Sequence, residues 1–297
     1  MSAPPAAQQL ARFAVSPARR RTDRAARAAI LVATLLALVP LVLIVYYLLR
    51  KGLGSWSTSF FSTDPTGNTF FASSSIGGIK SALLGTIEIV AVASAISVPI
   101  GIAVAVWLVE YGKGSRLATT VRFFVDVLTG VPSIIFGLFI YVALIVGTGS
   151  SYAGYKGSLA LSLLMLPVVT RAAEVILLLV PDVLRESALA LGAPRWRVIA
   201  RIVLPTALPG MVTGVLLAIA RAAGETAPLL FTAAATLKTN FAPGQFMNSL
   251  PVQIYNDVTS PTTAVVNRAW GAALTLVVMI GVLNMIARLV ARRSRLA

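Results

Sequence analysis

Two pairs of charged residues interrupt long apolar runs of this sequence. Arg171 and Glu174 lie three positions apart. Arg221 and Glu225 lie four positions apart, so on helices each pair would share one face. An ionised side chain at the centre of a membrane-spanning helix costs about 2.5 to 3.5 kcal/mol, which is why such residues usually face a cavity or another helix. Because a guanidinium matches the oxygens of phosphate and carboxylate groups, the two pairs predict a pathway for an oxyanion.

The acid beside each arginine would keep the empty pathway near neutral and would weaken anion binding enough to permit release. The alternative is that the two pairs only lock neighbouring helices together. Glu88 is a further acid within an apolar run, and for this residue alone the helix-locking interpretation is favoured. Gly214 and Ala218 lie on the same helical stripe as Arg221, and such small residues permit helices to approach closely.

A polar stretch between two apolar runs, residues 182–205, has a regular spacing. Glu186-Ser187-Ala188 is followed by three residues and Gly192, and nine further residues lead to Ile202-Val203-Leu204-Pro205. A polar segment that leaves the membrane between two spans can dock in a groove on a partner protein. The plain alternative is an ordinary amphipathic linker.

Local residue preferences predict two helical segments within this stretch. Asp182 can cap the first helix at its N-terminus, and Gly192 with Pro194 would end it. The second segment, residues 196–203, is amphipathic and basic. Leu204-Pro205 is then expected to turn the chain back into the membrane.

The composition is that of a helical membrane protein that crosses the bilayer several times. The 297 residues are 57% hydrophobic and only 12% charged, with a mean hydropathy of +0.86. Several apolar runs reach about 20 residues, the length that crosses the hydrocarbon core of a bilayer. We therefore predict an all-α membrane protein with six transmembrane helices, at residues 28–49, 81–109, 125–146, 158–180, 209–231 and 269–287.

The net charge of +15 does not indicate nucleic-acid binding, because the basic residues cluster beside the predicted spans. Cytoplasmic loops carry an excess of Lys and Arg. Of the 25 such residues, 17 fall on one side and 6 on the other, which predicts that both termini are cytoplasmic. The chain has no cysteine and no histidine, which removes thiol chemistry, most zinc sites and histidine proton relays.

The same map divides the chain into four parts. The first apolar run is too long for a signal peptide and is expected to stay as a span. The basic tail before it is expected to be disordered or to lie at the membrane surface. The parts are a cytoplasmic tail at 1–27, the first helix with an external loop at 28–79, the main transmembrane domain at 80–288 and a basic cytoplasmic end at 289–297.

The spacing over residues 182–205 resembles the EAA loop of the membrane subunits of ABC importers, with Ser187 replacing one alanine. Other stretches are similar to the PstA family of phosphate importer permeases. They are Met165-Leu166-Pro167 with Thr170-Arg171 and Glu174, the run A-R-A-A-G-E-T-A-P from Ala220 to Pro228, and Glu110-Tyr111-Gly112. The resemblance extends from about Lys80 to Ala287 and implies a type I ABC importer permease fold with a cytoplasmic coupling helix.

The resemblance also implies roles and partners. The residues that would couple the chain to an ATPase are Asp182, Glu186, Ser187, Ala188, Gly192, Leu204 and Pro205. The implied partners are a homologous PstC-type permease subunit, two PstB-type ATPase subunits that hold ATP and Mg, and a PstS-type phosphate-binding protein. The implied solute is phosphate, and the implied location is the cytoplasmic (inner) membrane.

Two further expectations concern chemistry and docking. The sequence has no G-x-x-x-x-G-K-[ST] phosphate-binding loop, the element that holds nucleotide phosphates in such ATPases. We therefore expect a non-catalytic subunit without a cofactor or metal of its own and without a nucleic-acid partner. The loops at 52–79 and 233–267 are candidates for docking the binding protein, or else plain solvated connections.

Three other functions fit parts of the sequence. An ABC permease for another solute, such as sulfate, molybdate or an amino acid, would share the loop at 182–205. A proton-coupled secondary transporter could use Glu88, Glu174 and Glu225, but it gives no reason for the spacing of that loop. A membrane-anchored regulator could use the basic ends. Copurification with an ATPase separates the ABC permeases from the other two.

Overall fold

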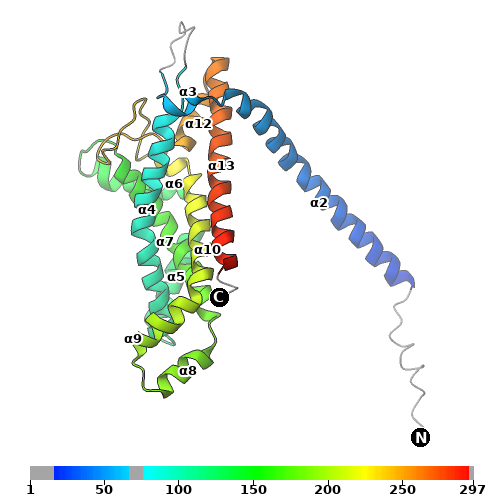
Figure 1. Cartoon of the computed structure of the whole chain (residues 1–297), viewed down its shortest axis with the longest axis vertical. Coiled ribbons are helices and arrows are strands. Elements are labelled where there is room, and N and C mark those ends of the chain that lie inside the picture. The colour runs from blue at the N-terminus through cyan, green and yellow to red at the C-terminus, as the bar shows by residue number, and fades with distance from the viewer. Residues whose placement is uncertain (1–16, 67–75, 294–297) are drawn as a thin grey trace. The chain divides into compact units, whose positions relative to one another are not determined.

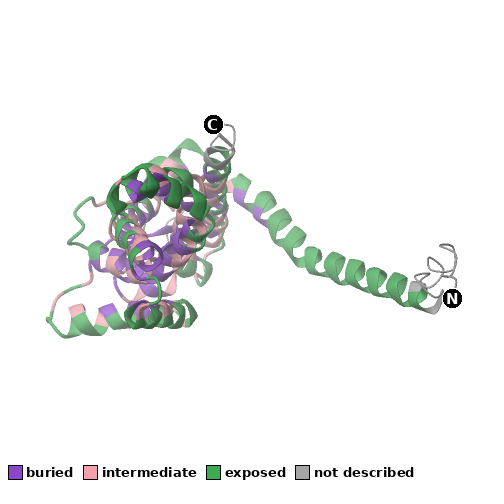
Figure 2. Cartoon of the chain, turned by 90° about the horizontal axis from the view of Figure 1, so that it is seen from below, coloured by how far each residue is buried: buried purple, intermediate pink, exposed green. Residues whose placement is uncertain are grey.

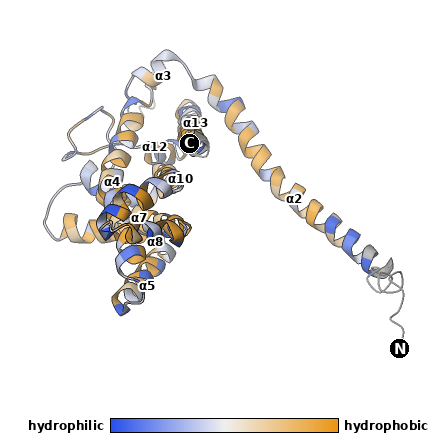
Figure 3. Cartoon of the chain, turned by 60° about the horizontal axis from the view of Figure 1, so that its bottom comes forward, coloured by the Kyte–Doolittle hydropathy of each residue, from blue (hydrophilic) through white to orange (hydrophobic). Residues whose placement is uncertain are grey.

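The structure is a computed structural model that describes residues 17–66 and 76–293. The chain forms two compact units, residues 1–50 and 51–297. Helix α2 (Pro17–Gly52) makes up the described part of the first unit (Figure 1). Its most apolar stretch has 0% of its residues buried within this chain, and Figure 3 shows apolar residues along most of its length. Because α2 begins at Pro17 and not at Ala28, residues 17–27 of the predicted tail are helical.

The second unit is a helical bundle. Figure 1 shows α4, α7, α10 and α13 side by side, with α8 and α9 at one end and α3 and α12 at the other. Buried residues gather inside this bundle and exposed ones surround them (Figure 2). Its helices are η1 (Leu53–Ser55), α3 (Thr58–Ser62), α4 (Lys80–Val106), η2 (Trp107–Tyr111), α5 (Arg116–Gly130), α6 (Ser133–Ile140), η3 (Tyr141–Val146), α7 (Gly154–Leu178), α8 (Asp182–Ala190), α9 (Arg195–Val198), η4 (Ile199–Val203), α10 (Leu204–Ala223), α11 (Ala227–Leu230), α12 (Leu250–Val258) and α13 (Thr263–Arg293).

Small residues let α7 lie close to α4 and α10. A Cβ added to Gly101 of α4 would come within 2.8 Å of the Val169 side chain, and one added to Gly214 of α10 would come within 2.7 Å of Ala172 Cβ. Small residues let helix backbones approach closely, and at these two positions an added Cβ would clash unless a neighbour shifted. The predicted role of Gly214 as a contact between helices is therefore confirmed.

Five helices in the described residues are long and apolar enough to cross a membrane, and a sixth is counted if α5 and α6 form one span. The prediction of one helix over 125–146 is wrong, because α5 and α6 meet at a bend of 100°. Pro132 lacks an N–H and keeps Val131 in an extended conformation (ψ 130°), which ends a helix. Since α5 begins at Arg116, much of the connection predicted between the spans 81–109 and 125–146 is helical, and Arg122 lies on a helix.

The fifth span differs at both ends from its prediction. The helix runs continuously from Arg195 to Ala223, so the turn expected at Leu204-Pro205 is wrong. Pro205 lies in the first turn of α10, directly after the π-helical segment η4. In this position its missing N–H interrupts no regular α-helical hydrogen bond. The span ends at Gly224, before the predicted residue 231.

The predicted connection at 233–267 contains helix α12 and packs onto the bundle. Asn248 and Leu250 are buried, and the Leu250 amide donates a hydrogen bond of 2.8 Å to Thr86 Oγ1 of α4. Arg268 of α13 pairs with Asp257 of α12 at 2.7 Å. The interpretation of this loop as a plain solvated connection is therefore wrong. In the loop at 52–79, residues 67–75 lie outside the described residues.

Candidate functional site

The predicted pair Arg171 and Glu174 belongs to a network of four charges between α5 and α7. Arg171 Nη1 lies 2.7 Å from Glu174 Oε2, and Arg122 Nε of α5 lies 2.6 Å from Glu174 Oε1. Asp126, also of α5, accepts from Arg171 Nη2 at 2.9 Å. The Glu174 side chain is 2% exposed, whereas those of Arg122, Arg171 and Asp126 are 32%, 40% and 51% exposed. One buried carboxylate thus holds two partly exposed guanidinium groups.

The sequence predicted half of this network and missed the other half. Arg122 and Asp126 lie four positions apart and share a face of α5, the same spacing as that of Arg221 and Glu225. The pair was missed because Arg122 was assigned to the connection before the predicted span 125–146 and Asp126 to the start of that span. The network contains two positive and two negative groups, so their formal charges cancel.

The second predicted pair lies where a helix ends. Arg221 is in the last turn of α10, and Glu225 follows the C-cap residue Gly224, so the expectation of a pair within one continuous helix is wrong. Arg221 Nε lies 3.7 Å from Glu225 Oε1, with the side chains 56% and 17% exposed. The run A-R-A-A-G-E-T-A-P therefore spans the break between α10 and α11. Its arginine is the most exposed of the four pathway residues predicted from the sequence.

The two arginine sites lie at different levels of the bundle. Arg171 is next to Ala172, which faces Gly214 of α10. Arg221 follows Gly214 by seven residues, which corresponds to about 10 Å along a helix. The structure therefore separates the two predicted pairs into two sites.

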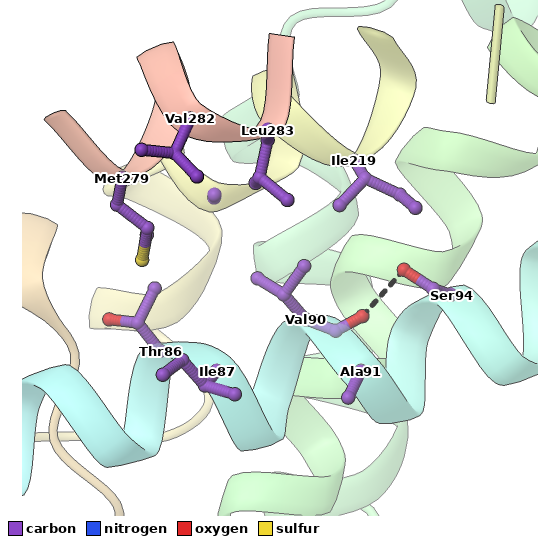
Figure 4. A pocket seen from close by; sticks show the side chains of 10 residues that line it. Thr86, Ile87, Val90, Ala91, Ser94, Ile219, Met279, Val282 and Leu283 are labelled. Atoms are coloured by element: carbon purple, nitrogen blue, oxygen red, sulfur yellow. Dashed lines mark hydrogen bonds between the residues drawn. The ribbon is translucent and has the colours of Figure 1, made fainter. Parts of the chain in front are cut away.

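A cavity of about 490 Å³ between α4, α10 and α13 offers no charge to an anion (Figure 4). Its polar side chains are the hydroxyls of Thr86 and Ser94, and Ser94 Oγ donates to the Val90 carbonyl at 2.7 Å. The remaining lining residues are Ile87, Val90, Ala91, Ile219, Ala223, Met279, Val282 and Leu283.

Glu88 is half-buried on α4 and has no hydrogen-bond or ion-pair partner in the described part of the chain. Within that part, no side chain is therefore available for Glu88 to lock a neighbouring helix in place.

The predicted coupling helix is present as α8. Pro181 is its N-cap residue and Asp182 is its first residue, so the prediction that Asp182 caps the helix is wrong. Asp182 instead pairs with Arg185 at 3.0 Å and with Lys113 at 3.8 Å. Gly192 follows the helix with φ +81°, a conformation that glycine adopts without strain, so the predicted end is confirmed.

The segment from α8 to α9 presents apolar side chains that its own chain leaves uncovered. Val183 is 69% exposed, Leu191 is 88% exposed and Trp196 is 59% exposed. Among the predicted coupling residues, Glu186, Ser187 and Pro205 are exposed, Leu204 is half-buried and Ala188 is buried. Exposed apolar residues beside polar ones are typical of a surface that contacts a partner protein.

Comparisons with known proteins agree with this arrangement. The family model described as "Binding-protein-dependent transport system inner membrane component" matches residues 97–296. Among solved structures, the inward-facing MetNI methionine ABC transporter has a TM-score of 0.60 at 22% identity, over 72% of this chain and 94% of that one. A bacterial alginate ABC transporter bound to its periplasmic protein has a TM-score of 0.61 at 17% identity, over 91% of this chain and 96% of that one.

Curated relatives are more similar in sequence. The phosphate transport system permease protein PstA 1 of Mycobacterium tuberculosis is 44% identical over 269 residues, which cover 87% of this chain and 86% of the relative. PstA of Yersinia pestis is 37% identical over 93% of this chain and 92% of the relative.

The helical bundle, the helix α8 between two spans and the family match define a class, the multi-pass inner-membrane permeases of ABC importers. These are non-catalytic transport components. Within that class the chain belongs to the PstA family of permease proteins. The predicted fold class and the predicted family are both confirmed.

Proposed function

We propose that this permease moves inorganic phosphate across the cytoplasmic membrane, past Arg171 and then past Arg221 or in the reverse order. The observation that carries this proposal is the presence of partly exposed arginines at two levels, each beside a carboxylate. Arginine suits a phosphate oxyanion because its fork of N–H donors binds two oxygens at once. The PstA relatives are phosphate transport system permease proteins, and this similarity supports the choice of phosphate.

The exposure of each acid suggests how phosphate would bind and leave. Asp126 is half exposed on Arg171, whereas Glu174 is buried beneath the same guanidinium. A phosphate oxygen can replace Asp126 on Arg171 while Glu174 keeps the arginine in place. When Asp126 returns, it displaces the anion. This exchange keeps the charge of the site low in both states, so that phosphate binds weakly enough to move on.

Energy would enter at α8. We assign ATP and Mg to two PstB-type ATPase subunits that receive the exposed face of α8, with a homologous PstC-type subunit completing the membrane pathway. The coupling residues are Asp182, Glu186, Ser187, Ala188, Gly192, Leu204 and Pro205. Closure of the ATPase pair would move α8 and rock the spans between inward-open and outward-open states.

The proposed coupling of α8 to the ATPase subunits also sets the orientation of the chain in the membrane. The end of the bundle with α8 would face the cytoplasm, as would both termini, in agreement with the excess of basic residues on that side. The opposite end, with the loops at 52–79 and 233–267, would receive a PstS-type binding protein loaded with phosphate. The ordered packing of α12 supports a docking surface of fixed shape at that end.

The test is uptake of radiolabelled phosphate by cells that make this chain with its neighbouring transporter subunits. Arg171→Gln and Arg221→Gln should each abolish uptake while the complex still assembles, and sulfate is the control solute. Wild-type uptake by both variants would make the arginines structural. Transport of another solute alone would reject phosphate, and uptake that needs a proton gradient in place of ATP would identify a secondary transporter.

A further inference from the structure

The inner end of α4 is held by the loop that carries α8. This end is η2, which contains Glu110 and Tyr111 of the Glu110-Tyr111-Gly112 stretch. The Glu110 side chain is 5% exposed. A buried carboxylate needs a charged partner, and the structure shows which residue supplies it.

Arg185 of α8 is that partner, and it also binds α7. Its guanidinium contacts Glu110 Oε1 through Nε at 3.0 Å and through Nη2 at 2.9 Å. It donates further to the carbonyls of Leu177 at 2.9 Å and Val180 at 2.6 Å, where α7 ends. A cation at this place satisfies carbonyls that have no partner within the helix. One side chain, 11% exposed, therefore joins α8, α7 and the end of α4.

Arg195, which follows Gly192 in the same loop, also contacts this end of α4. Its Nη2 donates to the Glu110 carbonyl, and its guanidinium lies 5.3 Å from the centre of the Tyr111 ring. The two arginines flank Gly192, so the loop holds Glu110 both before and after its turn. Neither contact could be read from the sequence, because Glu110 and Arg185 lie 75 positions apart.

The packing around these contacts is incomplete. A hollow of about 400 Å³ lies between α8 and the end of α4. Its lining residues are Glu110, Lys113, Asp182, Arg185, Glu186, Leu189, Arg195 and Val198. The hollow separates part of α8 from the end of α4, and Ala188 of α8 packs in one apolar cluster with Ala105 and Val109. The polar contacts of Glu110 fix the geometry of this connection beside that apolar packing.

We propose that Glu110, held by Arg185 and Arg195, is the joint through which movement of α8 reaches α4 and α7. These are positioning residues, and the inference rests on the proposed coupling role of α8. It gives the Glu110-Tyr111-Gly112 stretch a mechanical purpose. Without the joint, ATP hydrolysis by the partner subunits would displace α8 without moving the spans to the same extent.

The test measures phosphate ions moved per ATP hydrolysed, in proteoliposomes that contain the whole complex. Glu110→Gln and Arg185→Gln should each lower this ratio at least about fivefold, the lower range of coupling between distant sites. The exchanged pair Glu110→Arg with Arg185→Glu should recover part of it.

A second comparison uses exposed residues, so that folding is not at risk. Arg195→Gln should lower the ratio, whereas Arg197→Gln should not, because the guanidinium of Arg197 lies over the Trp196 ring of its own loop. Wild-type ratios in Arg195→Gln and Arg185→Gln would overturn the proposal, and so would an equal loss in Arg197→Gln. If the wild-type complex carries another solute, the phosphate function fails, and the ratio for that solute tests the joint.

Discussion

Glu174→Gln tests the four-charge network most sharply. Glutamine has nearly the shape of glutamate but no charge, so it removes the ionic part of two contacts, at 2.6 Å to Arg122 and 2.7 Å to Arg171. Breaking a fully buried ion pair costs about 3 to 5 kcal/mol. Both arginines are partly exposed, and Arg122 keeps its 3.0 Å bond to the Leu108 carbonyl. We therefore expect a loss of about 2 kcal/mol, near the value of one charged hydrogen bond.

The assay is thermal unfolding of the purified chain in detergent, compared with Glu225→Gln. The Glu225 pair is longer, at 3.7 Å, and its arginine is 56% exposed. Exposed pairs contribute about 0 to 1 kcal/mol, so this matched variant should unfold close to the wild type. Equal midpoints for the two variants would refute the bridging role of Glu174. A double variant with Arg122→Gln should add little to Glu174→Gln, because the two residues share one contact.

The remaining predictions concern glycines. Gly192→Glu should impair ATP-driven uptake while membrane insertion stays intact, because φ +81° is strained for any other residue; normal uptake would contradict the assignment of the coupling helix. Gly214→Val should lower the unfolding temperature and weaken assembly, because its Cβ would lie 2.7 Å from Ala172 Cβ. Gly281→Val is the matched control, since a Cβ there meets open space, and equal effects of the two valines would contradict close packing of α7 and α10.

Spacing within one helix was enough to find part of the site. Arg171 and Glu174 share a face wherever residues around them are helical, so their pairing could be predicted. The contribution of Arg122 could not, because it depends on where α5 begins and on how α5 crosses α7. The exposed fraction of each acid, which separates Asp126 from Glu174, also depends on that packing.

Two prolines show why the fold was predicted only in part. The helix predicted over 125–146 runs through Pro132, but the chain bends there. A turn was predicted at Pro205, but the helix continues through it. At Pro205 the π-helical segment before it accommodates the missing N–H, and this widening is not visible in residue types. Helix α12 was missed for a related reason, since its burial depends on Thr86 of α4, 164 positions before Leu250.

The central claim is that this chain forms the phosphate pathway of an ATP-driven importer. The most direct test reconstitutes it with its partner subunits and phosphate-loaded binding protein, and measures phosphate accumulation in vesicles with ATP on the α8 side. We predict accumulation that needs ATP, that sulfate does not replace, and that Arg171→Gln abolishes in an intact complex. Accumulation without ATP, or full accumulation by the Arg171→Gln complex, would contradict this account.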